Sequence, residues 1–114
     1  MKRGEVWTVS GGADYANKPR PAVIVQEDSF ASTNSVTICV FTTSEREASL
    51  YRLPVEPSSL NGLTRSSRLM VDKVSSVPRA KLGRRVGQLS AEDVSRLNQA
   101  LLVFLGLARP VARS

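Results

Sequence analysis

The stretch Arg20-Pro21-Ala22-Val23-Ile24-Val25 decides the fold, because an uninterrupted apolar run follows directly on a rigid dipeptide. A short apolar run of this kind predicts a strand that is buried on both faces or central to a barrel. Pro19 and Pro21 flank Arg20, restrict the backbone there and push the arginine toward an extended conformation. The direction of Arg20 is therefore fixed before any ligand arrives, which suits a preorganised contact.

Further strand-like segments lie on both sides of this run. Residues 51–55 alternate in polarity and include Pro54, which cannot donate to a ladder, so this segment is predicted to be an edge strand. Asn61-Gly62 marks the sharpest point of a turn over residues 57–63. About six short strands predict a small, strongly curved antiparallel barrel. The other predicted strands are 6–9, 36–41, 67–71 and 86–89, with short helical turns at 27–29 and 78–82 and polar loops at 10–18 and 45–50.

The C-terminal segment carries the one clear helix pattern. Ser90 is predicted to be the N-cap, with Glu92 and Asp93 at the positive end of the helix dipole, and Gly106 is predicted to end the helix. Its apolar residues extend over a second face near the end, which burial by a second subunit or in a groove of the same domain would explain. The apolar residues at helical spacing, which form one face of the helix, are Val94, Leu97, Leu101 and Phe104. The apolar residues outside that face are Leu102, Val103 and Leu105. The expected fold class is mainly β with a C-terminal α-helix (α+β), with one domain over residues 1–107 and a frayed tail over 108–114.

Composition excludes several classes of function. The 114 residues contain no histidine, which removes Ser-His-Asp and Cys-His catalysis, the paired-histidine mechanism of many ribonucleases and the commonest zinc sites. Cys39 is the single cysteine and lies in a strand-like run, so we interpret it as a buried, inert thiol. No apolar run is long enough to span a membrane, and the N-terminus lacks the apolar core of a secretory signal, which predicts a cytoplasmic protein.

Charge is distributed unevenly along the chain. Residues 1–57 hold six Lys/Arg and seven Asp/Glu, a net charge of −1, whereas residues 58–114 hold ten and three, a net charge of +7. A basic half predicts an anionic partner, most commonly nucleic acid, although a solubilising charge or an acidic protein partner is the alternative. The basic side chains that can follow phosphates are Lys18, Arg65, Arg68, Lys73, Arg79, Lys81, Arg84 and Arg85.

Five short motifs occur in order over nearly the whole chain. They are Lys2-Arg3-Gly4-Glu5-Val6-Trp7, the Arg20 to Val25 run, Thr42-Thr43-Ser44, the Ser67-x4-Asp72 pair and the segment from Leu82 to Leu89. Together they resemble the RGEIW opening, the RPxLVV strand, the TS after a strand, the Ser-x4-Asp element and the IGxL segment of the MazF/PemK/Kid family of toxin–antitoxin ribonucleases. Each motif is weak alone, but five in register are specific enough to indicate the family.

The resemblance implies an SH3-like barrel, a two-fold homodimer that binds RNA along its interface, and cleavage of single-stranded RNA at short sequences. The catalytic arginine and threonine of the family correspond to Arg20 and Thr43, and no metal or cofactor is expected. Supporting or RNA-binding roles fall to Lys18, Ser44, Ser67, Asp72, Lys73 and Glu5. Two departures, Phe41-Thr42 before the TS motif and Lys73 in place of the usual glutamine, predict a sequence preference unlike that of well-known members.

The chemistry of RNA explains why such a small set of residues suffices. The 2′-hydroxyl next to the scissile phosphate is an internal nucleophile, and its attack gives a 2′,3′-cyclic phosphate and a 5′-hydroxyl end. The planar guanidinium of Arg20 suits two phosphorane oxygens, and the hydroxyl of Thr43 suits a phosphate oxygen or the 2′-hydroxyl. The general base stays open among Glu5, Glu27 and Asp72, and Asp72 can instead read a base or hold the site in place.

Two rival functions belong to other classes. A non-catalytic toxin of the same fold, of the CcdB type that poisons DNA gyrase, is disfavoured because those proteins end in an aromatic-containing tail and this chain ends Val111-Ala112-Arg113-Ser114. A plain RNA-binding barrel would leave RNA intact and would tolerate Thr43→Ala without loss of affinity. The basic half and the patchy helix further predict a homodimer inhibited by an acidic antitoxin segment laid over the RNA groove.

Overall fold

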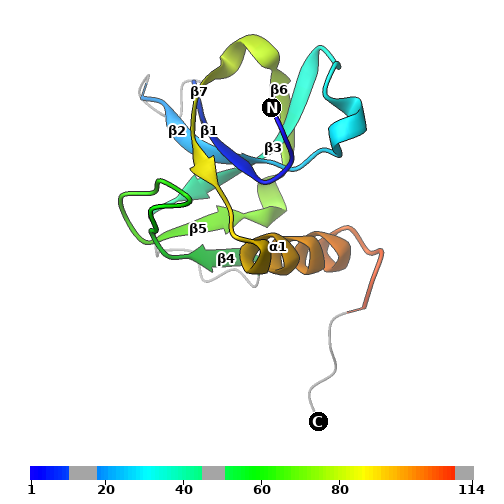
Figure 1. The fold of residues 1–114 in the computed structure, drawn as a ribbon. Coiled ribbons are helices and arrows are strands. Elements are labelled where there is room, and N and C mark those ends of the chain that lie inside the picture. The colour runs from blue at the N-terminus through cyan, green and yellow to red at the C-terminus, as the bar shows by residue number, and fades with distance from the viewer. Residues whose placement is uncertain (11–17, 45–50, 110–114) are drawn as a thin grey trace.

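A computed structural model describes residues 1–10, 18–44 and 51–109 (Figure 1). Within these residues one α-helix follows seven strands, and three short 3₁₀ turns connect them. The strands are β1 (Glu5–Val9), β2 (Arg20–Ile24), β3 (Ser35–Thr42), β4 (Arg52–Val55), β5 (Ser67–Met70), β6 (Ser75–Pro78) and β7 (Leu82–Gln88). The 3₁₀ turns are η2 (Asp28–Phe30), η3 (Val71–Lys73) and η4 (Arg79–Lys81), and the helix is α1 (Ala91–Phe104).

The strands form one antiparallel sheet in the order β4-β5-β3-β2-β1-β7, with β6 paired to β3 off this path. The long strand β3 bends the sheet, because Ile38–Val40 pair with β2, Phe41–Thr42 pair with β5 and Ser35–Ile38 pair with β6. The end strands β4 and β7 are not paired with each other among the described residues, so the sheet is strongly curved rather than a closed barrel. The predicted fold class is confirmed, and β4 is the edge strand that Pro54 indicated.

Two apolar cores lie on the two faces of the sheet. Val23 and Cys39 belong to the core beneath α1, together with Phe41 and the helix residue Leu97. Ala22 and Ile24 belong to the second core, inside the curl of the sheet. Because successive strand residues point to opposite faces, β2 is apolar on both sides, as its continuous apolar run predicted.

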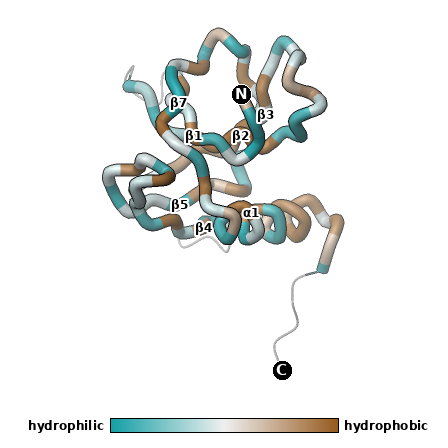
Figure 2. The backbone as a smooth tube through the Cα atoms, viewed as in Figure 1, coloured by the Kyte–Doolittle hydropathy of each residue, from teal (hydrophilic) through white to brown (hydrophobic). Residues whose placement is uncertain are grey.

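The helix α1 has the predicted limits. The Ser90 hydroxyl accepts a hydrogen bond from the Asp93 amide at 3.1 Å and caps the first turn. Gly106 follows the helix with φ of 77°, a left-handed conformation that favours glycine. Leu97 is buried against the sheet, whereas Leu102 and Leu105 stay 40% and 56% exposed. Figure 2 shows this hydrophobic colouring extending along the end of α1 and beyond it.

The sequence did not predict β6, and it predicted β7 to begin four residues too late, at Val86 rather than Leu82. Both segments are polar and lack alternation, so their strand conformation comes from pairing with β3 and β1. The predicted loop residues 11–17 and 45–50 and the tail residues 110–114 lie outside the described residues. In the described part of the chain, no helix is both long enough and apolar enough to cross a membrane.

Candidate active site

Two adjacent hollows share Thr43 and Ser67. The first, of about 250 Å³, is here called the apolar hollow, and the second, of about 180 Å³, the polar hollow. The apolar hollow is also lined by Pro21, Leu63, Val86, Arg65 and Arg84, among others. The polar hollow is completed by Thr42, Pro54, Glu56, Ser66 and Arg68. Thr43 therefore stands at the point where an apolar and a polar recess meet.

The end of β3 presents Thr43 to solvent. The Thr42 hydroxyl accepts a hydrogen bond from the Ser44 amide at 3.1 Å, so the chain turns there and leaves the ladder. Thr43 is exposed, whereas the neighbouring Ser67 is buried and its hydroxyl donates to the Arg65 carbonyl at 2.9 Å. The threonine hydroxyl is consequently available to a ligand on a fixed strand end, and Ser67 shapes the recess behind it.

The loop between β4 and β5 closes the apolar hollow because its backbone is held from inside. The buried Asn61 side chain accepts hydrogen bonds from the amides of Ser58 and Leu63, at 3.0 and 2.9 Å. The Gln88 amide then donates to the Leu60 carbonyl at 3.0 Å, which ties this loop to β7. A Cβ on Gly87 would lie 2.4 Å from that carbonyl oxygen, so only glycine allows the contact.

Arg20 begins β2 opposite Val9, and its side chain is half-buried. Arg20 and Ala22 point to the same face of the sheet, and Ala22 pairs with Val40. Val40 and Thr42 also share that face, and Thr42 pairs with Arg68. Strand alternation therefore places Arg20 and Arg68 beside Thr42 on one face of the sheet, and Arg20 itself is not among the residues that line either hollow. The exposed Lys18 lies two residues before Arg20, so a cluster of positive charge surrounds this end of β2.

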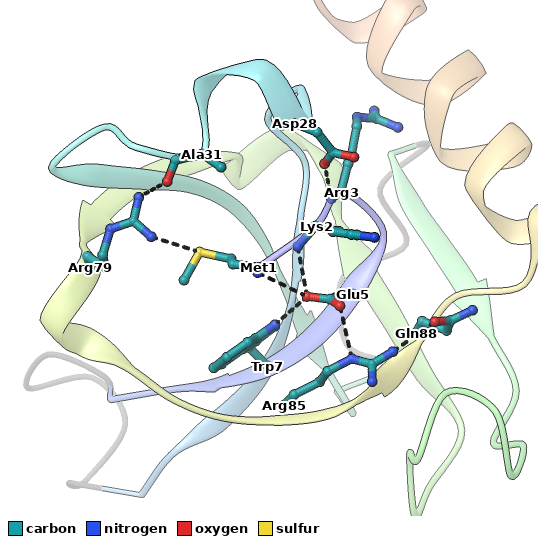
Figure 3. A network of polar contacts seen from close by, with 10 residues as sticks. All are labelled: Met1, Lys2, Arg3, Glu5, Trp7, Asp28, Ala31, Arg79, Arg85 and Gln88. Atoms are coloured by element: carbon teal, nitrogen blue, oxygen red, sulfur yellow. Dashed lines mark hydrogen bonds and ion pairs between the residues drawn. The ribbon is translucent and has the colours of Figure 1, made fainter.

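Glu5 lies outside both hollows, in a network on β1 and β7 (Figure 3). Its carboxylate accepts hydrogen bonds from the Lys2 amide at 2.8 Å and the Trp7 indole at 3.1 Å, and pairs with Arg85 at 3.1 Å. Burial alone would raise the pKa of Glu5, but the Lys2 and Trp7 hydrogen bonds together with nearby positive charge outweigh it and leave the pKa lowered. These contacts give Glu5 the role of fixing the N-terminal segment to the sheet.

Asp72 and Lys73 also lie away from the two hollows, on η3. The Asp72 carboxylate pairs with the guanidinium of Arg52 at 3.4 Å, and the Arg52 side chain is only 4% exposed. Lys73 is exposed. Glu27 accepts hydrogen bonds from the Ser29 amide and hydroxyl, so it caps η2. The three carboxylates considered as general base thus have structural partners and do not line either hollow.

Glu56 and Ser66 line the polar hollow and were not predicted as site residues. The Ser66 hydroxyl donates to the Glu56 carboxylate at 2.6 Å. Among the basic residues predicted to follow phosphates, Arg65 and Arg84 line the apolar hollow and Arg68 the polar one. In contrast, Arg79 donates to the backbone carbonyls of Ala31 and Thr33, and Arg85 pairs with Glu5.

The fold and the hollows define a class of protein: a small curved antiparallel sheet with one terminal helix and an arginine-lined recess suited to an anionic chain. The chain belongs to the PemK-like, MazF-like toxins of type II toxin–antitoxin systems, whose family model matches residues 2–105.

Individual relatives agree with this membership. The chain is 48% identical over 108 residues to a probable endoribonuclease MazF of Mycolicibacterium smegmatis, an alignment that covers 95% of this chain and 99% of that protein. It is 30% identical over 115 residues to endoribonuclease MazF9 of Mycobacterium tuberculosis, covering 94% and 98%. The solved structure of a mycobacterial endoribonuclease in complex with its cognate antitoxin has the same fold, with a TM-score of 0.78, 23% identity and coverage of 96% and 99%.

Proposed function

We propose that this protein is the toxin of a type II toxin–antitoxin pair and a sequence-selective endoribonuclease that cuts single-stranded RNA in the cytoplasm. The observation that carries the proposal is the position of Thr43, exposed where the apolar and polar hollows meet, in a recess that is also lined by Arg65, Arg68 and Arg84. Two recesses on either side of one hydroxyl suit two successive nucleotides, with the phosphate that joins them between the recesses.

Arg20 stabilises the charge that develops on the phosphate during cleavage. Its planar fork of N–H donors matches two phosphorane oxygens. Preorganised donors of this kind supply about 3–4 kcal/mol of transition-state stabilisation in a water-poor site. A guanidinium is a poor general base, so any proton that Arg20 transfers goes to the leaving 5′-oxygen.

Thr43 orients the attack. Its hydroxyl donates to a phosphate oxygen or accepts from the ribose 2′-hydroxyl, and the turn held by Thr42 and Ser44 fixes its backbone. The 2′-oxygen forms a new bond to phosphorus while the bond to the 5′-oxygen breaks, which leaves a 2′,3′-cyclic phosphate and a 5′-hydroxyl end. The reaction needs neither water nor a metal ion, because the nucleophile belongs to the substrate.

The test is to incubate the purified protein with total RNA in excess EDTA and to map new 5′-hydroxyl ends by selective ligation. The expected result is cleavage at a short recurring sequence, with Thr43→Val reducing the rate at least tenfold. Strict dependence on added metal would overturn the mechanism. RNA that stays intact would favour a plain RNA-binding protein or a gyrase poison.

The partners follow from charge and exposed apolar surface. An acidic antitoxin segment fits a surface whose hollows are lined by Arg65, Arg68 and Arg84. A second copy of the chain fits the end of α1, where a recess of about 420 Å³ is lined by Leu101, Leu102, Leu105 and Leu107 together with Arg3 and Asn98. Light scattering at micromolar concentration is expected to give a dimer, and Leu105→Glu a monomer. Phe30→Glu, at an exposed apolar residue of η2, is the control.

A further inference from the structure

The polar hollow holds a carboxylate in a place where RNA is proposed to bind. Among the described residues that line it, Glu56 is the one acidic residue and Arg68 is the one basic residue. A carboxylate repels phosphate, so a negative charge here disfavours a hollow that binds only the phosphate backbone of RNA. It suits a hollow that receives a base, because bases carry donors that a carboxylate accepts.

Glu56 is exposed at the polar hollow, and two hydrogen bonds restrain it. The Asn61 side chain donates to the Glu56 carbonyl at 2.9 Å, and Asn61 itself is buried, so the backbone at Glu56 is anchored. The Ser66 hydroxyl donates to Oε2 at 2.6 Å and restrains the side chain. A carboxylate accepts about four hydrogen bonds. Glu56 therefore keeps acceptor positions, including those of Oε1, for a ligand in the hollow.

The chemistry of the four bases then gives a preference. Adenine, cytosine and guanine each carry an exocyclic amino group that donates to a carboxylate, whereas uracil presents two carbonyl oxygens flanking a single N–H. Arg68, in the same hollow, supplies donors for a ring nitrogen or a carbonyl of the same base. An acceptor beside a donor matches an amino-bearing base, and the uracil carbonyls face repulsion from the carboxylate.

We propose that Glu56 is a specificity-determining residue, which selects a base with an exocyclic amino group over uracil in the nucleotide next to the cut. The inference rests on the proposed ribonuclease function, because the hollow adjoins the cut only if Thr43 contacts the scissile phosphate. Thr43 and Ser67 line this hollow as well as the apolar one, so the base that enters it belongs to a nucleotide flanking that phosphate.

The experiment compares cut sites of the wild type and Glu56→Gln on one randomised RNA library, read by sequencing the 5′-hydroxyl ends. Glutamine keeps the size of the side chain but adds an N–H donor that suits a uracil carbonyl. The wild type is expected to discriminate against uracil at one position next to the cut. In Glu56→Gln this discrimination is expected to fall about tenfold. The control is Glu92→Gln, an exposed carboxylate in the first turn of α1, with cut sites expected to match the wild type.

Ser66→Ala provides a second variant that keeps the carboxylate and removes its restraint. It is expected to weaken the same preference by a smaller factor, and thermal unfolding of both variants verifies that they are folded. A wild type that cuts RNA while Glu56→Gln retains its base preference overturns this inference alone. If Glu56→Gln loses cleavage equally at every sequence, the inference is also overturned, because that result is expected for a general base. A wild type that cuts no RNA overturns the proposed function itself.

Discussion

The substitution Asp72→Asn tests whether this carboxylate stabilises the fold or takes part in RNA binding. Sequence resemblance associates it with the site, but its carboxylate contacts the guanidinium of Arg52 at 3.4 Å, with side-chain exposures of 28% and 4%. Removing one partner of a fully buried pair costs about 3–5 kcal/mol, because the other charge remains in the interior. Since Asp72 is partly exposed to solvent, we expect Asp72→Asn to cost about 2 kcal/mol.

That free energy converts directly into a melting temperature. An unfolding entropy of about 2.1 cal/mol/K per residue gives ~0.24 kcal/mol/K for 114 residues, so Asp72→Asn should lower Tm by about 8 °C. The control is Asp93→Asn, which breaks the exposed pair with Arg96 on α1, and a loss of at most ~0.5 kcal/mol or about 2 °C is expected there. Circular dichroism at pH 7 measures both shifts.

Cleavage of a fluorogenic RNA, measured well below both melting temperatures, completes this test. If Asp72 is structural, the folded Asp72→Asn variant should retain kcat/KM within about twofold of the wild type. An unchanged Tm together with a loss of cleavage greater than tenfold would refute the structural role and return Asp72 to the RNA-binding surface.

Three other predictions follow from named contacts. Because the pKa of Glu5 is lowered, its stabilising contribution is present above pH 4.5 and is lost as the pH falls through the folded pKa. In urea titrations, the wild type should therefore be more stable than Glu5→Gln at pH 6–7, and this difference should shrink in acid. Gly87→Ala should cost about 1–3 kcal/mol and slow cleavage, because its Cβ meets the Leu60 carbonyl and displaces a loop of the apolar hollow; equal activity per folded molecule would contradict this. Burial, aided by the charge of Asp72, raises the pKa of Cys39 to about 12, so iodoacetamide at pH 8 should label it only after denaturation.

The sequence predicted those parts of the fold whose signal is local. The apolar run of β2 needs no partner to be recognised, and Ser90 and Gly106 mark the two ends of α1 by their own hydrogen-bonding and backbone preferences. The polar strand β6 carries no such signal, because its conformation comes from pairing with β3. Tertiary contact overrides local preference at that point.

The candidate site divides in the same way. The resemblance of short motifs predicts Arg20 and Thr43 as catalytic residues. The structure brings Thr43 together with Ser67, whereas Arg20 lines neither hollow. The sequence does not predict Glu56 and Ser66, because they are ten residues apart in a loop whose path depends on the buried Asn61. Single charged or hydroxyl residues in a loop have no periodicity, so only the folded chain shows that they meet.

The most direct test of the central claim uses an RNA oligonucleotide containing the mapped cut site, made with ribose throughout or with a single 2′-deoxyribose on the 5′ side of the scissile phosphate. In EDTA, the wild type should cut the first to a cyclic phosphate and leave the second intact while binding both with similar affinity. Cutting of the deoxy-substituted strand at the same phosphate would contradict internal attack and, with it, the roles given to Arg20 and Thr43.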